Sequence, residues 1–146
     1  MNLTDKYIQE IADNLDIGQI CFINTDTMEM ETAISTKHWD ETSIAEEFNE
    51  EVYVKINQWK RFIKIEPLES DEAFQIMEDF VEQFIPEDAF KHQVIHTLSN
   101  HKPFQNFKFI IESSPYRQEW FDFKLMKIKE HVIRLLKLKM DEASNS

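Results

Sequence analysis

Residues 103–123 read PFQNFKFIIESSPYRQEWFDF, and seven of these 21 residues are aromatic. They are Phe104, Phe107, Phe109, Tyr116, Trp120, Phe121 and Phe123. Pro103 and Pro115 each stand where a helix can begin, because proline is well tolerated at the first helical position. Aromatic residues at helical spacing are typical of a core. We therefore expect Trp120 to be buried between the last helix and the helix over residues 103–111.

Helical periodicity continues on both sides of this stretch. A long helix is predicted from Pro115 to about Met140, with one narrow apolar face. That face contains Phe121, Leu125, Ile128, Val132 and Leu135, at 4-3-4-3 spacing. Upstream, Ser70 is predicted to cap a helix over residues 70–84, and Pro86 to begin another over residues 86–98. The apolar residues of the latter helix are Ala89, Phe90, Val94, Ile95 and Leu98, of which Phe90, Val94 and Leu98 form one stripe. These elements form a four-helix C-terminal array.

The first third of the chain predicts a short helix and a small antiparallel sheet. Thr4 can cap a helix over residues 4–15, which Gly18 ends in a left-handed conformation. Strands are expected over residues 19–24, 28–34 and 60–66, and the second of them should have one face in water. The structure of residues 35–59 is left open. The part around Phe48 could be a loop or one or two helical turns, and residues 52–56 are β-prone. The class is therefore α+β.

Length and composition fit one domain over residues 1–146, with a polar, frayed tail at 141–146. Gly18 is the only glycine, which excludes both common glycine-rich phosphate loops. Cys21 is the only cysteine, so neither an internal disulfide nor a cysteine-based zinc site can form. No signal peptide and no membrane-spanning run is recognised, and no cofactor is expected. We expect a cytoplasmic protein, either a monomer or a homodimer.

Charge is distributed unevenly along the chain, whose net charge is −12. Residues 1–90 hold 22 acidic and 6 basic residues, a balance of −16, whereas residues 91–139 hold 4 acidic and 10 basic residues, a balance of +6. Such asymmetry indicates either a surface for a partner or attraction between the two segments within the chain. The second interpretation requires no partner and is the simpler one.

Several motifs occur in an order that resembles an uncharacterised bacterial protein family, number 158 of the UPF series. The matching segments are Phe22-Ile23-Asn24-Thr25-Asp26, Ile76-Met77-Glu78-Asp79-Phe80, Leu98-Ser99, Pro103-Phe104, Phe107-Lys108, and Tyr116 through Phe123. The likeness covers roughly residues 18–125. It implies a compact bacterial cytoplasmic domain without an assigned activity, so it transfers no catalytic residues.

Two positions depart from the family pattern. Thr27-Met28 stands where the family often reads Thr-Gly, and Leu98-Ser99-Asn100 stands where it often reads Leu-Ser-Gly. Asparagine tolerates the left-handed conformation that a glycine would supply. A turn is therefore still predicted at Asn100.

Candidate chemistry is sparse, and no catalytic or cofactor-binding residues are assigned. His92 and His96 are four residues apart on a predicted helix and could grip a metal, although no glutamate lies between them. Glu78, Asp79 and Glu82 form an acidic helix face that could bind a cation or serve as an acid and base. A solvated surface is the favoured explanation of both groups.

Basic residues of the last helix are the candidate interaction residues: Arg117, Lys124, Lys127 and Arg134. Together with His131 and Trp120, the last three could bind phosphates and stack on bases. The net negative charge opposes that interpretation. Arg117 could hold an anion, pair with an acid of residues 70–84 or stack on Trp120.

Three functional classes follow from these observations. The favoured one is a non-enzymatic protein-binding or regulatory module that recognises a protein partner through the acidic half of the chain. The alternative is a metal-binding protein or hydrolase-type enzyme that uses His92, His96 or the acidic helix face. A nucleic-acid role for the last helix is the third.

Overall fold

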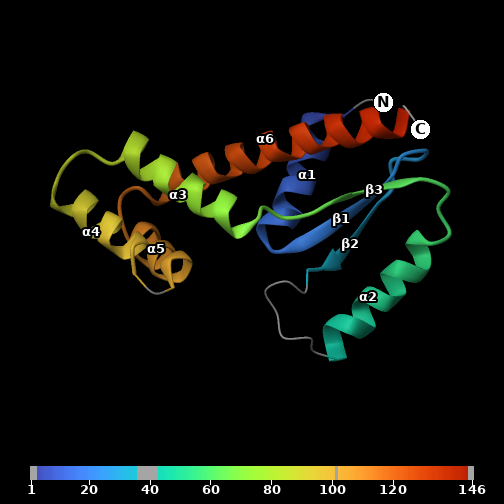
Figure 1. Cartoon of the computed structure of the whole chain (residues 1–146), viewed down its shortest axis with the longest axis horizontal. Helices are drawn as coiled ribbons and strands as arrows, with labels where there is room; N and C mark the ends of the chain where they lie inside the picture. The colour runs from blue at the N-terminus through green and yellow to red at the C-terminus, as the bar shows by residue number, and fades with distance from the viewer. Residues whose placement is uncertain (1–2, 36–42, 101, 145–146) are drawn as a thin grey trace. The chain divides into compact units, whose positions relative to one another are not determined.

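In the computed structural model, residues 3–35, 43–100 and 102–144 are described, and they contain six helices and three strands (Figure 1). In chain order they are α1 (Asp5–Asp16), β1 (Gln19–Asn24), β2 (Met30–Ile34), α2 (Ser43–Ile56), β3 (Phe62–Ile65), α3 (Ser70–Phe84), α4 (Ala89–Leu98), α5 (Pro103–Glu112) and α6 (Arg117–Ser144). The predicted α+β class and the order of helix, sheet and helices are confirmed.

The chain gathers into two compact units. The first unit holds residues 1–67 and 128–146, and the second holds residues 68–127. Helix α6 contributes its first part to the second unit and the rest to the first unit. The expectation of one domain over residues 1–146 stays a prediction.

The first unit is built around a three-stranded antiparallel sheet in the order β2-β1-β3. Cys21 of the central strand lies opposite Thr32 on one side and Ile65 on the other. Side chains of a strand alternate between its faces, so Ile20 and Phe22 lie on one face and Cys21 on the other. Every residue of β1 after Gln19 is buried, which shows that both faces of the sheet are covered.

Helix α2 covers the face that carries Ile20 and Phe22. Its Val52 and Ile56 belong to the same buried cluster as these two residues and Ala33. The prediction of a β-prone run at residues 52–56 is therefore wrong, because these residues form the C-terminal end of α2, where Val52 and Ile56 lie one turn apart on the face that packs on the sheet. The prediction that one face of the second strand lies in water is also wrong, since Ala33 on that face is fully buried.

Side chains cap both edges of the sheet. At the β2 edge, Asn49 of α2 accepts a hydrogen bond from the Ile34 amide and donates one to the Ile34 carbonyl, both at 2.9 Å. At the β3 edge, the Lys139 ammonium of α6 donates to the Lys64 carbonyl. Exposed strand edges invite pairing with other chains. These contacts occupy backbone groups that would otherwise be open.

Helix α1 packs against β1 through its apolar face. Ile11, Ala12 and Leu15 are buried, and the Cys21 thiol lies 4.0 Å from the Ile11 carbonyl oxygen. The predicted ends of this helix are confirmed. The Thr4 hydroxyl accepts a hydrogen bond from the Tyr7 amide, and Gly18 has a left-handed φ of 84°.

Met28 occupies the left-handed conformation at φ 65°, a conformation that favours glycine. A residue with a β carbon is strained there by about 1–2 kcal/mol. Replacing Met28 with glycine removes this strain, but glycine has a larger conformational entropy in the unfolded chain, which costs about 0.4–1 kcal/mol of stability. We therefore expect Met28→Gly to be more stable than Met28→Ala by roughly 0.5 kcal/mol in urea unfolding. A Met28→Ala variant at least as stable as Met28→Gly would contradict this assignment.

The second unit has an aromatic core that confirms the interpretation of Trp120. This side chain is 6% exposed, and its ring centroid lies 5.3 Å from that of Phe80 in α3 and 5.0 Å from that of Phe107 in α5. Both pairs have edge-on geometry, which aromatic rings favour. Trp120 therefore joins three helices of this unit.

Several predicted helix boundaries shift by a few residues. Glu69 caps α3 in place of Ser70 and forms a capping box with Glu72. The Asp88 carboxylate caps α4 by accepting a hydrogen bond from the Lys91 amide at 3.0 Å, so Pro86 is not the first helical residue. Pro103 does begin α5, as predicted. The left-handed residue before α5 is Lys102 and not Asn100, because Lys102 has φ 53°.

The last helix begins at Arg117 after a turn, two residues later than predicted, and continues to Ser144. Of the tail predicted over residues 141–146, residues 141–144 are helical and residues 145–146 lie outside the described part. The buried face is also rotated from the predicted one. It contains Trp120, Phe123, Ile128, His131, Val132 and Leu136. The expected Phe121, Leu125 and Leu135 are only half-buried.

Candidate functional site

Helices α3 and α4 of the second unit form the walls of an open groove of about 400 Å³. Its lining residues are Phe74, Glu78, Val81, Glu82, Ile95, Leu98 and Ser99. Val81 and Leu98 are buried, whereas Ile95 is 44% exposed. The groove therefore combines buried apolar side chains with an apolar side chain that is still open to solvent.

The apolar surface extends from the groove toward α5. The Phe74 ring lies edge-on to the Phe104 ring, with centroids 6.3 Å apart. Phe104 is 43% exposed, although sequence periodicity predicts it in the core. Together, Ile95, Phe74 and Phe104 give the second unit an apolar surface to which α3, α4 and α5 each contribute one side chain.

Two members of the predicted acidic face line this groove. Glu78 and Glu82 are one helical turn apart on α3, and both are exposed. Asp79 does not line the groove, and its carboxylate accepts a hydrogen bond from the Gln75 side chain at 2.9 Å. The structure therefore separates the three acids into a pair at the groove and a third residue with a local partner.

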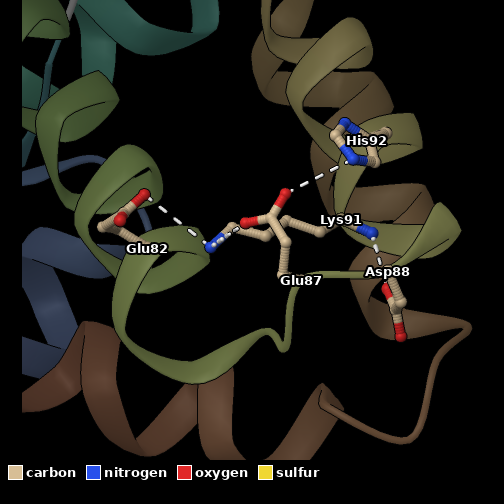
Figure 2. Close-up of polar contacts among 5 residues, drawn as sticks. All are labelled: Glu82, Glu87, Asp88, Lys91 and His92. Atoms are coloured by element: carbon tan, nitrogen blue, oxygen red, sulfur yellow. Dashed lines mark hydrogen bonds and ion pairs between the residues drawn. The ribbon is translucent and has the colours of Figure 1, made fainter.

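A buried lysine connects α3 with the start of α4 beside this groove (Figure 2). Lys91 is 6% exposed, and its ammonium lies 3.5 Å from a Glu87 carboxylate oxygen and 3.8 Å from a Glu82 oxygen. Both carboxylates reach into solvent, so the stem of Lys91 is buried while its charge meets acids at the surface. Glu82 is thereby held at the groove by a cation from the opposite helix.

His92 and His96 both lie on exposed positions of α4 and do not line the groove. The His92 Nε2 atom lies 3.3 Å from the other carboxylate oxygen of Glu87, as Figure 2 shows. Within residues 3–35, 43–100 and 102–144, no group of three or more His, Cys, Asp or Glu side chains is arranged to hold a metal ion. Of the predicted histidine pair, His92 therefore has one carboxylate contact, and no three-ligand arrangement forms within these ranges.

The basic residues at the start of α6 lie over aromatic rings of the same helix. The Arg117 guanidinium is 5.2 Å from the centroid of Phe121, and not over Trp120 as considered from the sequence. The Lys124 ammonium lies 5.8 Å from the Trp120 centroid and 5.5 Å from that of Phe121. At exposed sites each such contact contributes about 0.5–1 kcal/mol. Arg117 and Lys124 therefore contact the aromatic side chains of their own helix.

Further along α6, Lys127 lies over the Phe123 ring at 5.5 Å. The Arg134 guanidinium contacts His131 Nδ1 at 3.0 Å, and His131 Nε2 lies 3.4 Å from the Glu66 carbonyl oxygen. Because arginine can only donate, Nδ1 accepts and Nε2 donates to the carbonyl. His131 is 6% exposed, so it belongs to the core and not to a nucleic-acid surface.

Part of the charge asymmetry is satisfied within the chain. The Lys129 ammonium of α6 lies 3.6 Å from an Asp5 carboxylate oxygen of α1, and Lys91 contacts Glu82 and Glu87. These contacts join the basic half of the sequence to the acidic half, as the simpler interpretation expects. Glu78 and Glu82 nevertheless stay exposed at the groove.

Burial protects the lone thiol from ionisation. Cys21 is fully buried, and desolvation together with the charge of Glu10 raises its pKa to about 12. Desolvation also raises the pKa of Tyr7 to about 12, and its hydroxyl donates to the Met28 carbonyl at 3.0 Å. Both groups are therefore neutral near neutral pH and take part in packing.

This burial predicts a loss of stability in alkali. Between pH 9 and 12 the unfolded chain releases the Cys21 proton while the folded chain keeps it, so the free energy of unfolding falls as pH rises. One proton corresponds to about 1.4 kcal/mol for each pH unit. We therefore measure the free energy of unfolding in urea at pH 8, 10 and 11 for wild type and Cys21→Ala. Above pH 9, the value for wild type should fall by about 1.4 kcal/mol more per pH unit than the value for Cys21→Ala. Parallel pH profiles for the two proteins would contradict the assignment.

The groove was not predicted from the sequence. Leu98 was placed on the apolar stripe of its helix, and Ile95 was named only as another apolar residue of that helix. One signal for Ile95 was available, because Val94 and Leu98 are four residues apart and fix the buried face of α4. Ile95 lies about 100° from Val94 around the helix, which places it at the edge of the buried face.

Fold and site together define a small α+β protein whose second unit carries an acid-flanked apolar groove. The chain belongs to the uncharacterised protein family UPF0158, whose family model matches residues 4–143, so the resemblance noted in the sequence is confirmed. No curated protein and no solved structure matches the chain. None of the helices in the described ranges is both long and apolar enough to span a membrane.

Proposed function

We propose that this protein is a non-enzymatic module that binds another protein through the groove between α3 and α4. The observation that carries the proposal is the apolar surface formed by exposed Ile95 and Phe104 and half-buried Phe74, beside two exposed carboxylates. Contiguous exposed apolar side chains rimmed by polar residues mark protein interaction sites. The expected place of action is the bacterial cytoplasm.

The charge around the groove supports recognition of a partner through the acidic half of the chain. Residues 65–90 contain nine acidic residues and no Lys or Arg, and α3 alone contains five of the acids. An acidic surface accelerates encounter with basic partners and disfavours acidic ones. Nucleic acids are therefore disfavoured at this groove.

The alternatives have less support. His92 has Glu87 as a carboxylate neighbour, and this pair would be the starting point for a metal-binding or hydrolytic function. The nucleic-acid interpretation of α6 loses His131 to the core and shares Lys124 and Lys127 with neighbouring aromatic rings. Neither alternative accounts for the apolar groove.

The proposal is tested by immobilising the full-length protein, passing cell extract over it and quantifying the proteins that it retains. We compare wild type with Ile95→Asp, which places a charge in the groove at an exposed position, and with Glu50→Lys on α2 as a surface control. Partners retained by wild type and Glu50→Lys but lost from Ile95→Asp would support the proposal. An identical set of proteins on all three would show that the groove is not the binding surface.

A further inference from the structure

We infer that the occupant of the α3/α4 groove is a basic amphipathic helix of the partner, an inference that rests on the proposed protein-binding function. An amphipathic helix recognises such a groove with apolar anchors at positions i, i+3 or i+4, and i+7. The groove has apolar residues at its base and carboxylates on one wall. An occupant therefore needs one apolar stripe and a basic flank.

The α3 wall of the groove has the length of two turns of such a helix. On α3 the lining residues run from Phe74 through Glu78 and Val81 to Glu82. These eight helical steps correspond to about 12 Å. Anchors at i and i+7 of a bound helix are about 10.5 Å apart. A volume of about 400 Å³ accommodates apolar side chains and not a whole helix, so the body of the partner helix stays at the mouth of the groove.

Charge complementarity selects the sign of the flanking residues. Glu78 and Glu82 project from the α3 wall, while Ile95 and Ser99 on the α4 wall are uncharged. Lys91 contacts Glu82 from beyond the groove, and the Glu82 side chain is still 81% exposed. Lysine or arginine on the side of the bound helix that faces α3 would meet both carboxylates. Attraction of this kind weakens with salt.

A designed 14-residue peptide tests the inference directly. It carries Leu at i, i+3, i+4 and i+7 and Lys on both flanks, and its fluorescence anisotropy is followed during titration with the full-length protein. We expect saturable binding that weakens at least tenfold in Glu78→Lys/Glu82→Lys and in Ile95→Asp, and that is unchanged in Glu50→Lys. Raising NaCl from about 50 to 500 mM should weaken binding to wild type more than to the charge-reversed variant.

Matched peptides separate specific docking from simple charge attraction. A scrambled peptide of the same composition lacks the apolar stripe, and a Lys→Glu version carries the opposite charge, so neither should bind. Equal binding of the scrambled peptide, or equal affinity in all protein variants, would overturn the inference. If no designed peptide binds while groove-dependent partner capture persists, the helical occupant is wrong and the proposed function stands. If no designed peptide binds and partner capture does not depend on the groove either, both the helical occupant and the proposed function are wrong.

Discussion

Replacing Trp120 with alanine is expected to lower the free energy of unfolding by about 3–5 kcal/mol. The indole is buried against Phe80 and Phe107, so truncation removes apolar contact and leaves a cavity shared by α3, α5 and α6. Domains of this size have a total stability of about 5–15 kcal/mol. The loss would therefore be a large fraction of the whole.

Urea unfolding followed by circular dichroism measures this effect without relying on tryptophan fluorescence. Phe109→Ala is the matched control, because this ring on α5 is 73% exposed and its loss should cost less than about 0.5 kcal/mol. Trp120→Phe keeps much of the apolar volume and covers the case in which the alanine variant does not fold. Equal stability of the Trp120→Ala and Phe109→Ala variants would show that Trp120 is not a core residue.

Replacing Asn49 with leucine is expected to cost about 2–4 kcal/mol. The side chain is buried and satisfies both backbone groups of Ile34 at the edge of the sheet. Leucine has a similar size but no polar atom, so an amide and a carbonyl each lose their partner at about 1–3 kcal/mol when buried. The expected cost is smaller than the sum of the two penalties, because water can reach part of the β2 edge of the sheet.

Hydrogen exchange and urea unfolding together identify the mechanism of this loss. In Asn49→Leu, exchange of the Ile34 amide should accelerate more than that of Cys21 in the central strand. Glu50→Ala changes an exposed residue of the same helix and should stay within about 0.5 kcal/mol of wild type. Wild-type stability of Asn49→Leu would mean that these two hydrogen bonds contribute nothing.

The elements with strong periodicity could be predicted from the sequence. The apolar spacing in residues 4–15 and 70–84 and the turn chemistry after β1 gave correct elements, because their local and tertiary preferences agree. Helix α2 could not be assigned, since its apolar residues are not confined to one helical face and Val52 and Ile56 also suit a strand. Only packing against Ile20 and Phe22 decides in favour of a helix.

The phase of α6 and the groove depend on tertiary contacts that no local pattern contains. Trp120 and Phe123 set the buried face of α6 through Phe80, which rotates the predicted stripe. The groove arises because α4 packs on α3 in a register that leaves Ile95 exposed. Residues 78 and 82 were recognisable as an acidic face, but their apolar neighbours could be placed beside them only by the fold.

Our central claim is that the binding surface of this protein is the α3/α4 groove, while the aromatic cluster around Trp120 is core. Two-dimensional amide NMR of the full chain during titration with the basic amphipathic peptide tests it most directly. We predict the largest chemical-shift changes at Phe74, Glu78, Ile95 and Ser99, with little change at the Trp120 indole. Largest changes at the Trp120 indole, with the groove amides unmoved, would contradict the account.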